Sequence, residues 1–294
     1  MARRSQVAGR NGSPDRGAVS EADGEVDFLS DSAAVKFNHS PFLSNGGFLR
    51  ATSHEPRPSK ATSELRGRQA PLIPIERKRI MTKEEHVRHL LEDPVYAIMG
   101  NEELCLGRSN MDVAKELIAA GVTIIQYREK HKKWRAKYEE AKAIAQLCHD
   151  HDVTFIMNDS TDLAIACGAD GIHVGQDDAP AQIVRQLAGP DVFIGVSTNT
   201  VDEMKQALAD GADYVGFGPM FPTQSKKDAD EVVTPEAKEY ALKFDLPVVT
   251  IGGISLANIR SLYDEGFRSF AMISAIVGQK DIKGAVEKIR RTLR

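Results

Sequence analysis

Short apolar runs alternate with helical stretches from Pro94 to the end of the chain. Most residues in each run are hydrophobic, with little of the polar alternation that marks a half-exposed strand. Runs of this kind indicate strands covered on both faces, as in a parallel sheet. We predict eight such strands, at residues 95–99, 122–126, 153–157, 171–174, 192–196, 214–217, 247–251 and 269–273.

Helical patterns lie between these runs, for example at residues 112–120, 138–149 and 201–209. A weak internal repeat places a glycine after a helical stretch and before a strand, where a left-handed helix cap is expected; the glycines are Gly121, Gly168, Gly211 and Gly266. Eight such units in about 200 residues reach the lower size limit of a (β/α)₈ TIM barrel. A doubly wound open α/β sheet, the alternative, typically has five or six strands and often a GxGxxG motif, and neither feature is present.

The first 75 residues have a different character. They are rich in Ser, Gly, Arg and Pro, and no helical or strand period persists. Such a segment buries too little apolar surface to offset its ordering entropy, so we predict a disordered N-terminal extension at residues 1–75 and a barrel domain at 76–294. Six acidic residues within the first 31 argue against a transit peptide, although targeting to an organelle stays open. Thr82 and Glu85 form a capping-box pattern that predicts a short helix.

Composition narrows the possible functions. Hydrophobic residues make up 41% of the chain and the net charge is −4, so a sizeable core is expected and a basic nucleic-acid-binding surface is not. No apolar run approaches the roughly 20 residues of a membrane span. Cys105, Cys148 and Cys167 form no CxxC pair and are predicted to be reduced packing residues. We therefore expect a cytoplasmic protein with no nucleic-acid or membrane partner; its oligomeric state stays open.

Two carboxylates follow neighbouring predicted strands at the end where barrels of this class carry their active sites. Asp159 follows the third strand and Asp178 the fourth. Mg²⁺ in proteins is commonly held by one or two carboxylates, with substrate phosphates and water completing its shell. Helix capping is the alternative, because both residues precede helices and Asp is a favoured N-cap. Their placement on adjacent strands beside cationic residues favours a metal site.

Cationic residues occupy the same predicted rim. Arg128, Lys130 and Lys226 follow strands and are suited to stabilise a departing diphosphate. The alternative is solvated surface charge, which we expect for Lys132, Lys133 and Lys227.

The last two strands supply a second anion site. Gly252 and Gly253 allow the backbone to approach an anion closely, and Ser274 offers an N–H and a hydroxyl near a helix start. Loops after strands 7 and 8 often bind a monophosphate in these barrels. Two phosphate-type sites, one with a metal and one without, suggest an enzyme that joins two phosphorylated substrates.

Residues 94–294 resemble the thiamine-phosphate synthase family. Seven motifs follow in that family's order, which makes the resemblance specific: Gln126–Lys130 (similar to QxREK), Asn158–Asp159, His173–Asp178, Gly195–Thr198, Gly218–Thr223, Ile251–Ile254 and Ile273–Ile276. The resemblance implies a transferase that joins a hydroxymethylpyrimidine diphosphate to a thiazole phosphate or thiazole carboxylate. It also implies a dissociative mechanism in which diphosphate leaves before the thiazole nitrogen attacks, with no general base.

The resemblance further implies roles for individual residues. Mg²⁺ would be held by Asp159 and Asp178, and catalysis would rest on Arg128, Lys130, Lys226 and Ser197. The pyrimidine diphosphate would be bound by Gln126, Arg128, Glu129, Lys130, Asn158, Ser197 and Lys226. The thiazole phosphate would be bound by Thr223, Ser225, Gly253, Ile273 and Ser274.

Two positions depart from the family pattern. Asn199 stands where the family usually has His, and Ser225 replaces a Thr but keeps its hydroxyl. Asn199 counts against a related thiazole tautomerase, whose proton-transfer His resembles this position. A non-catalytic thiamine-phosphate-binding protein is the other alternative, and retention of the two Asp and Lys226 argues against it. His173 either lines the site or fills the barrel interior.

Overall fold

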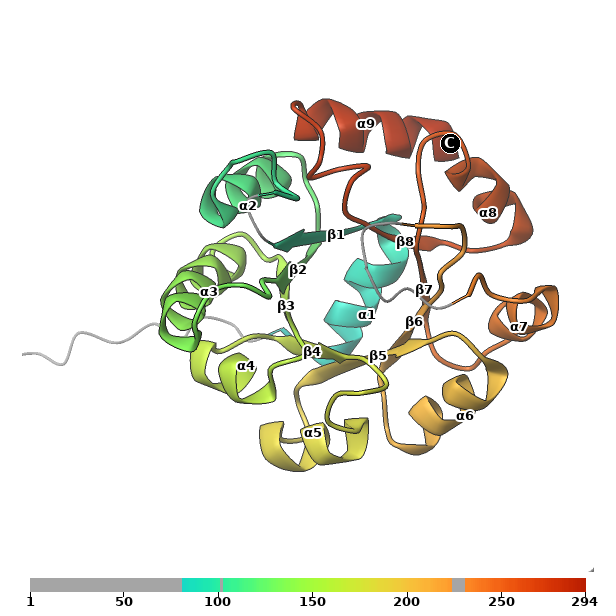
Figure 1. The fold of residues 1–294 in the computed structure, drawn as a ribbon, viewed down its shortest axis with the longest axis horizontal. Coiled ribbons are helices and arrows are strands. Elements are labelled where there is room, and N and C mark those ends of the chain that lie inside the picture. Colours follow the sequence, from blue (N-terminus) through green and yellow to red (C-terminus); the bar gives the residue numbers. More distant parts are fainter. Residues whose placement is uncertain (1–80, 101–102, 224–230) are drawn as a thin grey trace, which may run out of the picture. The chain divides into compact units, whose positions relative to one another are not determined.

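Eight parallel strands close into a barrel in chain order in the computed structural model, which describes residues 81–100, 103–223 and 231–294 (Figure 1). The predicted (β/α)₈ barrel is confirmed, and every predicted strand lies within two residues of its expected bounds. The strands are β1 (Val95–Gly100), β2 (Ile124–Arg128), β3 (Thr154–Asn158), β4 (Gly171–Val174), β5 (Phe193–Thr198), β6 (Tyr214–Phe217), β7 (Val248–Ile251) and β8 (Ser269–Met272).

A ring of helices surrounds this barrel, and one further helix, α1, lies across its centre in the view of Figure 1. The predicted glycine caps are confirmed, because Gly121, Gly168, Gly211 and Gly266 all have positive φ. The described helices are α1 (Lys83–Glu92), α2 (Asn110–Ala119), α3 (Trp134–His149), α4 (Thr161–Cys167), α5 (Ala181–Ala188), α6 (Val201–Ala209), α7 (Pro235–Ala241), α8 (Ile259–Glu265) and α9 (Ile282–Leu293).

The strands bury both of their faces, which explains why their sequences read as continuous apolar runs. In β1, Val95, Ala97 and Met99 pack in the layer between the sheet and the helices. The alternate residues Tyr96 and Ile98 point into the barrel and belong to a separate inner core. That inner core also contains Ile124, Ile156, Phe193, Tyr214, Val249 and Ala271 from other strands, and Leu90 from α1.

Helix α1 covers the end of the barrel at which the strands begin. It starts with the predicted capping box, in which Thr82 and Glu85 bond each other's backbone N–H. The Nδ1 atoms of His86 and His89 both lie 2.9 Å from the Thr154 hydroxyl at the start of β3. With this end covered, the opposite end is left for a site.

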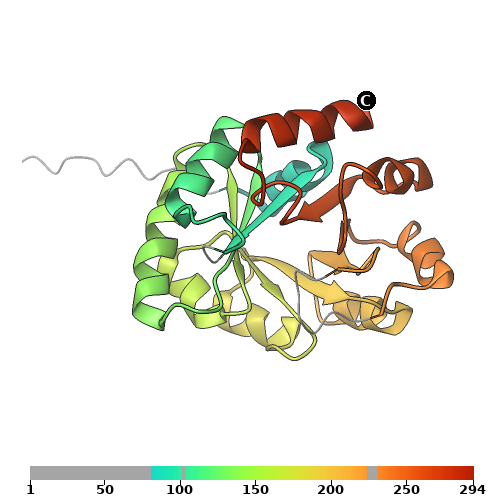
Figure 2. The ribbon, with the colours of Figure 1, turned by 45° about the horizontal axis from the view of Figure 1, so that its top comes forward.

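The barrel seam is tied by an arginine of the last helix. Arg290 of α9 pairs with the buried carboxylate of Asp93, directly before β1, and its Nη1 atom donates to Ala120 O at 2.7 Å. Figure 2 shows α9 lying beside α2 at this seam. Arg290 thus links the end of the chain to the first strand.

The remaining expectations about the chain have mixed outcomes. Cys105, Cys148 and Cys167 are free and buried, which confirms their packing role. The predicted disorder of residues 1–75 lies outside the described residues. Within the part of the chain that the structure describes, no helix has the length and apolar character needed to span a membrane.

The histidines beneath the barrel predict an acid-sensitive fold. Burial lowers the pKa of His86 and of His89 below 6.5, so the unfolded chain binds more protons than the folded chain just below that pH. The free energy of unfolding therefore rises with pH in the range below about 6.5, and the contribution of these two histidines decreases as the pH falls through that range. We expect His89→Gln, which can still bond Thr154, to reduce this slope by up to about 1.4 kcal/mol per pH unit.

Urea unfolding of the full chain between about pH 5 and pH 8 measures this slope. His151→Gln is the matched control, because the His151 side chain is exposed and bonds only Leu147 O among the described residues. Equal slopes for wild type and His89→Gln would contradict the assignment.

Candidate active site

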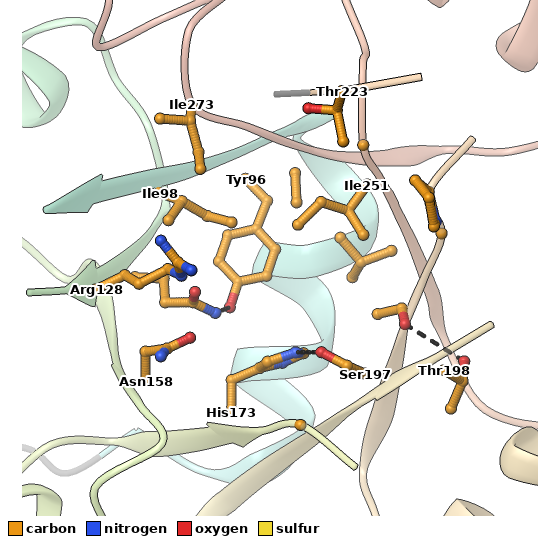
Figure 3. A pocket seen from close by; sticks show the side chains of 18 of the residues that line it. Tyr96, Ile98, Arg128, Asn158, His173, Ser197, Thr198, Thr223, Ile251 and Ile273 are labelled. Carbon is orange, nitrogen blue, oxygen red and sulfur yellow. Dashed lines mark hydrogen bonds between the residues drawn. The ribbon is translucent and has the colours of Figure 1, made fainter. Parts of the chain in front are cut away.

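A cavity of about 500 Å³ opens at the carboxyl ends of the strands. Every strand of the barrel contributes at least one residue to its lining. Figure 3 shows side chains from opposite sides of the barrel, among them Arg128, His173, Ser197 and Thr223, gathered around this space.

Most of the residues predicted for the site line this cavity. They are Gln126, Arg128, Lys130, Asn158, Asp159, Asp178, Ser197, Thr223, Gly253, Ile273 and Ser274. Ser225 and Lys226 lie outside the described residues. Of the predicted residues that are described, Glu129 alone is not part of the lining.

Asp159 and Asp178 do not cap the helices that follow them. The N-cap of α4 is Ser160 and that of α5 is Pro180, so the capping alternative does not account for either carboxylate. Asp159 has a φ of +63°, a left-handed conformation that Asp tolerates better than most residues. Asp178 Oδ2 accepts from Gly175 N at 2.8 Å, which holds its carboxylate over the end of β4.

The two carboxylates repel each other. The pKa of Asp159 is raised by burial and by the nearby charge of Asp178, and Lys130 only partly offsets this. The Lys130 Nζ atom lies 3.2 Å from Asp159 Oδ2, and about half of the lysine side chain is exposed. Such a pair is suited to a divalent cation that takes its other ligands from a phosphate and water. The described residues contain no group of three or more His, Cys, Asp and Glu arranged around a metal position.

Glu129 and Lys132 stabilise the loop after β2. Glu129 is buried, and its Oε1 atom accepts from the backbone N–H of His131 at 2.7 Å. Lys132 lies outside the cavity lining, in line with the expected surface position, but it is only partly exposed: its Nζ atom lies 2.8 Å from Glu140 Oε1, and Glu140 also accepts from the Tyr127 hydroxyl. These contacts hold the segment that carries Arg128 and Lys130.

Polar side chains bond one another across the floor of the cavity. Gln126 bonds Tyr96, Tyr96 bonds Tyr214, and Tyr214 bonds Nδ1 of His173. The Nε2 atom of His173 lies 3.0 Å from Ser197 Oγ, and this contact is visible in Figure 3. The two open alternatives for His173 therefore both apply, because it fills the barrel interior and lines the site. Its burial lowers its pKa to about 4.

Sequence reasoning missed Tyr96 and Tyr214. The available signal was a tyrosine inside an otherwise aliphatic strand, since a buried tyrosine hydroxyl needs a partner.

Two glycines make room for this floor. A Cβ atom on Gly195 would lie 2.1 Å from Tyr214 Cζ, and one on Gly216 would lie 2.9 Å from His173 Cε1. The rings of Tyr214 and His173 occupy space that any side chain at these positions would take. The sequence pattern alone did not identify this role of the two glycines.

The backbone at the predicted second anion site agrees with the expectation only in part. Gly252 and Gly253 both have positive φ, and a Cβ on Gly253 would lie 2.7 Å from Pro222 O. The expected helix start at Ser274 is wrong. Ser274 begins a turn in which Val277 N bonds Ile273 O, and α9 begins only at Ile282, where the Asp281 side chain caps it.

Asn199 has a structural role beside the cavity. Its Nδ2 atom donates to Gly218 O at 3.1 Å and to Glu231 O at 2.9 Å. It therefore joins the two described ends of the segment between β6 and α7. An amide in this role supplies no titratable group for proton transfer.

The fold and the cavity define a (β/α)₈-barrel protein with carboxylates and cations at the strand ends. The family model described as thiamine monophosphate synthase matches residues 95–276, and the chain belongs to this family. A thiamine-phosphate synthase from Pelotomaculum thermopropionicum is 43% identical over 211 residues, which cover 71% of this chain and 96% of that protein. One from Shouchella clausii is 43% identical over 196 residues, covering 66% and 93%.

A solved structure agrees with these relatives. The structure of thiamine phosphate pyrophosphorylase from Pyrococcus furiosus matches with a TM-score of 0.63 and 33% sequence identity. The match covers 70% of this chain and 97% of that one. The structural match and the sequence relatives thus point to the same family.

The space made by Gly195 gives a test of the cavity floor. We expect Gly195→Ala to lower the free energy of unfolding by about 2 kcal/mol or more, because Tyr214 is stacked on Phe193 and cannot move aside. Chemical denaturation of Gly195→Ala, Tyr214→Leu and the double variant measures the coupling. The loss should be much smaller in the Tyr214→Leu background, and strictly additive effects would show that the ring is not what Gly195 accommodates.

Proposed function

We propose that this chain is a thiamine-phosphate synthase. It condenses 4-amino-2-methyl-5-(diphosphooxymethyl)pyrimidine with a thiazole phosphate to give thiamine phosphate and diphosphate. The observation that carries the proposal is the pairing of Asp159 and Asp178 beside Lys130, in one cavity with the glycine backbone of the second anion site. The activity in the names of its relatives supports it.

The reaction proposed for this cavity needs no general base. The bond between the pyrimidine methylene carbon and the diphosphate oxygen breaks, and its electron pair leaves with the diphosphate. The thiazole nitrogen then donates its lone pair to the methylene carbon, and no proton is removed. His173 fits this scheme because it is buried, has a low pKa and is already bonded through both ring nitrogens.

The chain's own cations stabilise the leaving group. Arg128 and Lys130 line the cavity beside the carboxylates, where their charges oppose the negative charge that develops on the diphosphate. Lys226 is assigned the same task from the family resemblance. Gln126, Asn158 and Ser197 also line the cavity and are proposed to hold the pyrimidine diphosphate.

Asp159 and Asp178 are proposed to hold Mg²⁺. Burial and the charge of Asp178 together raise the pKa of Asp159, and a cation between the two carboxylates would remove the part that is due to repulsion. When bound, Mg²⁺ neutralises the charge of the diphosphate and so turns repulsion by the two carboxylates into attraction.

The thiazole phosphate is proposed to lie at the opposite side of the rim. Gly253 and Ser274 would bind its phosphate through backbone N–H groups and the serine hydroxyl, with Thr223 and Ile273 beside them. Ser225 is assigned to the same group from the resemblance. The three free cysteines fit a reducing compartment, and we propose that the protein works in the cytoplasm.

Two alternatives are less well supported. A thiazole tautomerase would need a proton-transfer group near Asn199, and that side chain is an amide bonded to backbone carbonyls. A non-catalytic binding protein would have little use for a carboxylate pair at a diphosphate site. Turnover of both phosphorylated substrates separates these alternatives from a synthase.

The carboxylate pair gives the decisive experiment. Purified protein is incubated with both substrates and Mg²⁺, and thiamine phosphate is oxidised to its fluorescent product. We expect activity to vanish in excess chelator and to return with added Mg²⁺. Asp159→Asn keeps the size and the backbone conformation but loses one charge, so kcat should fall by about two orders of magnitude or more, or roughly 2.7 kcal/mol.

Asp162→Asn is the matched control. Asp162 lies in the first turn of α4, is exposed and bonds Trp134 Nε1, and it is not part of the cavity lining. We expect this variant to keep its activity, and thermal unfolding should show both variants to be folded. Wild-type turnover by Asp159→Asn and by Asp178→Asn would rule out the metal assignment.

A further inference from the structure

Five buried or cavity-lining groups form one continuous hydrogen-bonded chain across the barrel. The order is Gln126, Tyr96, Tyr214, His173 and Ser197, and the successive heavy-atom distances are 2.9, 2.9, 3.0 and 3.0 Å. These residues come from β2, β1, β6, β4 and β5. The hydrogen-bonded chain therefore connects β2 on one side of the cavity with β5 on another side, through the cavity floor.

We infer that all hydrogen bonds of this hydrogen-bonded chain are donated in one direction, from Gln126 toward Ser197. His173 is then held as its Nε2–H tautomer, and the Ser197 hydroxyl turns its proton toward the cavity. Tyr96 and Tyr214 are then positioning residues that act on the site through His173. The positioning role of the two tyrosines in catalysis rests on the function proposed above. The direction of the hydrogen bonds does not depend on that function.

The direction follows from counting protons along the chain. The Gln126 amide nitrogen donates to the Tyr96 oxygen, so the Tyr96 proton is free to go to Tyr214. Because Tyr214 accepts there, its own proton goes to Nδ1 of His173. A neutral imidazole that accepts at Nδ1 carries its proton on Nε2. His173 therefore donates to Ser197 Oγ, and the serine proton is left over.

Burial favours each step of this count. Tyr96, Gln126 and Tyr214 are each at most 2% exposed, so these groups bond one another in preference to bulk water, even though Tyr96 and Gln126 border the cavity. Burial also raises the pKa of both tyrosines, and each hydroxyl keeps its single proton. An unpaired donor or acceptor here would cost about 1–3 kcal/mol, which favours one consistent direction over a mixture.

The reverse direction fits the cavity less well. It would need the Gln126 carbonyl to accept from Tyr96, and it would end with Ser197 donating to His173. Ser197 would then present only lone pairs to a cavity whose Arg128 and Lys130 are suited to an anion. In the inferred direction, Ser197 presents a proton that an anionic oxygen can accept.

Nitrogen NMR of the full-length protein without substrates tests the direction. Protein with ¹⁵N-labelled histidine shows which ring nitrogen carries the proton, and the His173 signals are assigned by their loss in His173→Gln. We expect Nε2 to be protonated and Nδ1 to be bare in the wild type. A proton on Nδ1, or exchange between the two tautomers, would overturn the inference.

Tyr96→Phe removes one link without altering the ring. Tyr214 can then either donate to His173 or accept from it, so we expect the single tautomer to become a mixture. In the assay above, kcat should fall about tenfold, with the KM for the thiazole phosphate unchanged, because roughly one hydrogen bond is misdirected. An unchanged tautomer in this variant would also overturn the inference.

Tyr127→Phe is the matched control. Tyr127 is a buried strand tyrosine whose hydroxyl also makes a hydrogen bond, but it faces the outer core and donates to Glu140 at 2.6 Å. We expect it to keep the His173 tautomer of the wild type. An inactive wild type with an Nε2–H tautomer would refute the proposed function and leave this inference standing.

Discussion

Pairing of β8 with β1 closes the sheet, and the site depends on that closure. Tyr96 pairs with Ala271 at the seam, and Arg290 ties the last helix to Asp93 just before β1. Closure brings the carboxyl ends of all eight strands to one rim. Residues more than 100 positions apart, such as Arg128 and Gly253, therefore line one cavity. In an open parallel sheet they would lie far apart along the same edge.

The closed barrel also creates a requirement that the site meets. Its interior is an apolar core, yet its upper layer contains Gln126, His173 and two tyrosine hydroxyls. Buried polar groups are tolerated when they bond one another. The hydrogen bonds that link Gln126 to Ser197 satisfy these groups, and Gly195 and Gly216 provide the space for the rings of Tyr214 and His173. The cavity floor is therefore both packing and a set of oriented hydrogen-bonding groups.

Electrostatic interactions dominate at the rim of the cavity. Asp159 and Asp178 repel each other, and Lys130 is half exposed and offsets this only in part. The left-handed backbone at Asp159 keeps its carboxylate in this unfavourable position. Strain and repulsion at one point are typical of a site arranged for a ligand. The family to which this chain belongs is named for the synthesis of a phosphorylated product, thiamine monophosphate.

The sequence by itself determined the strands, the helix ends and most of the rim. Apolar runs and glycine caps depend on local periodicity and backbone freedom, so Val95–Gly100 and Gly168 were readable without a fold. Polar residues directly after strands had to reach the rim once a barrel formed, which placed Asp159, Asp178 and Arg128.

Only the tertiary structure decided which side chains bond one another. Glu129 was expected at the pyrimidine diphosphate, whereas the structure buries it and its carboxylate accepts from the His131 N–H of its own loop. Lys132 pairs with Glu140 eight residues away, and Ser274 begins a turn, whereas α9 starts only after its Asp281 cap. Tyr96 and Tyr214 meet across 118 positions of sequence. Local patterns carry no information about such partners, because the contacts exist only after the barrel has closed.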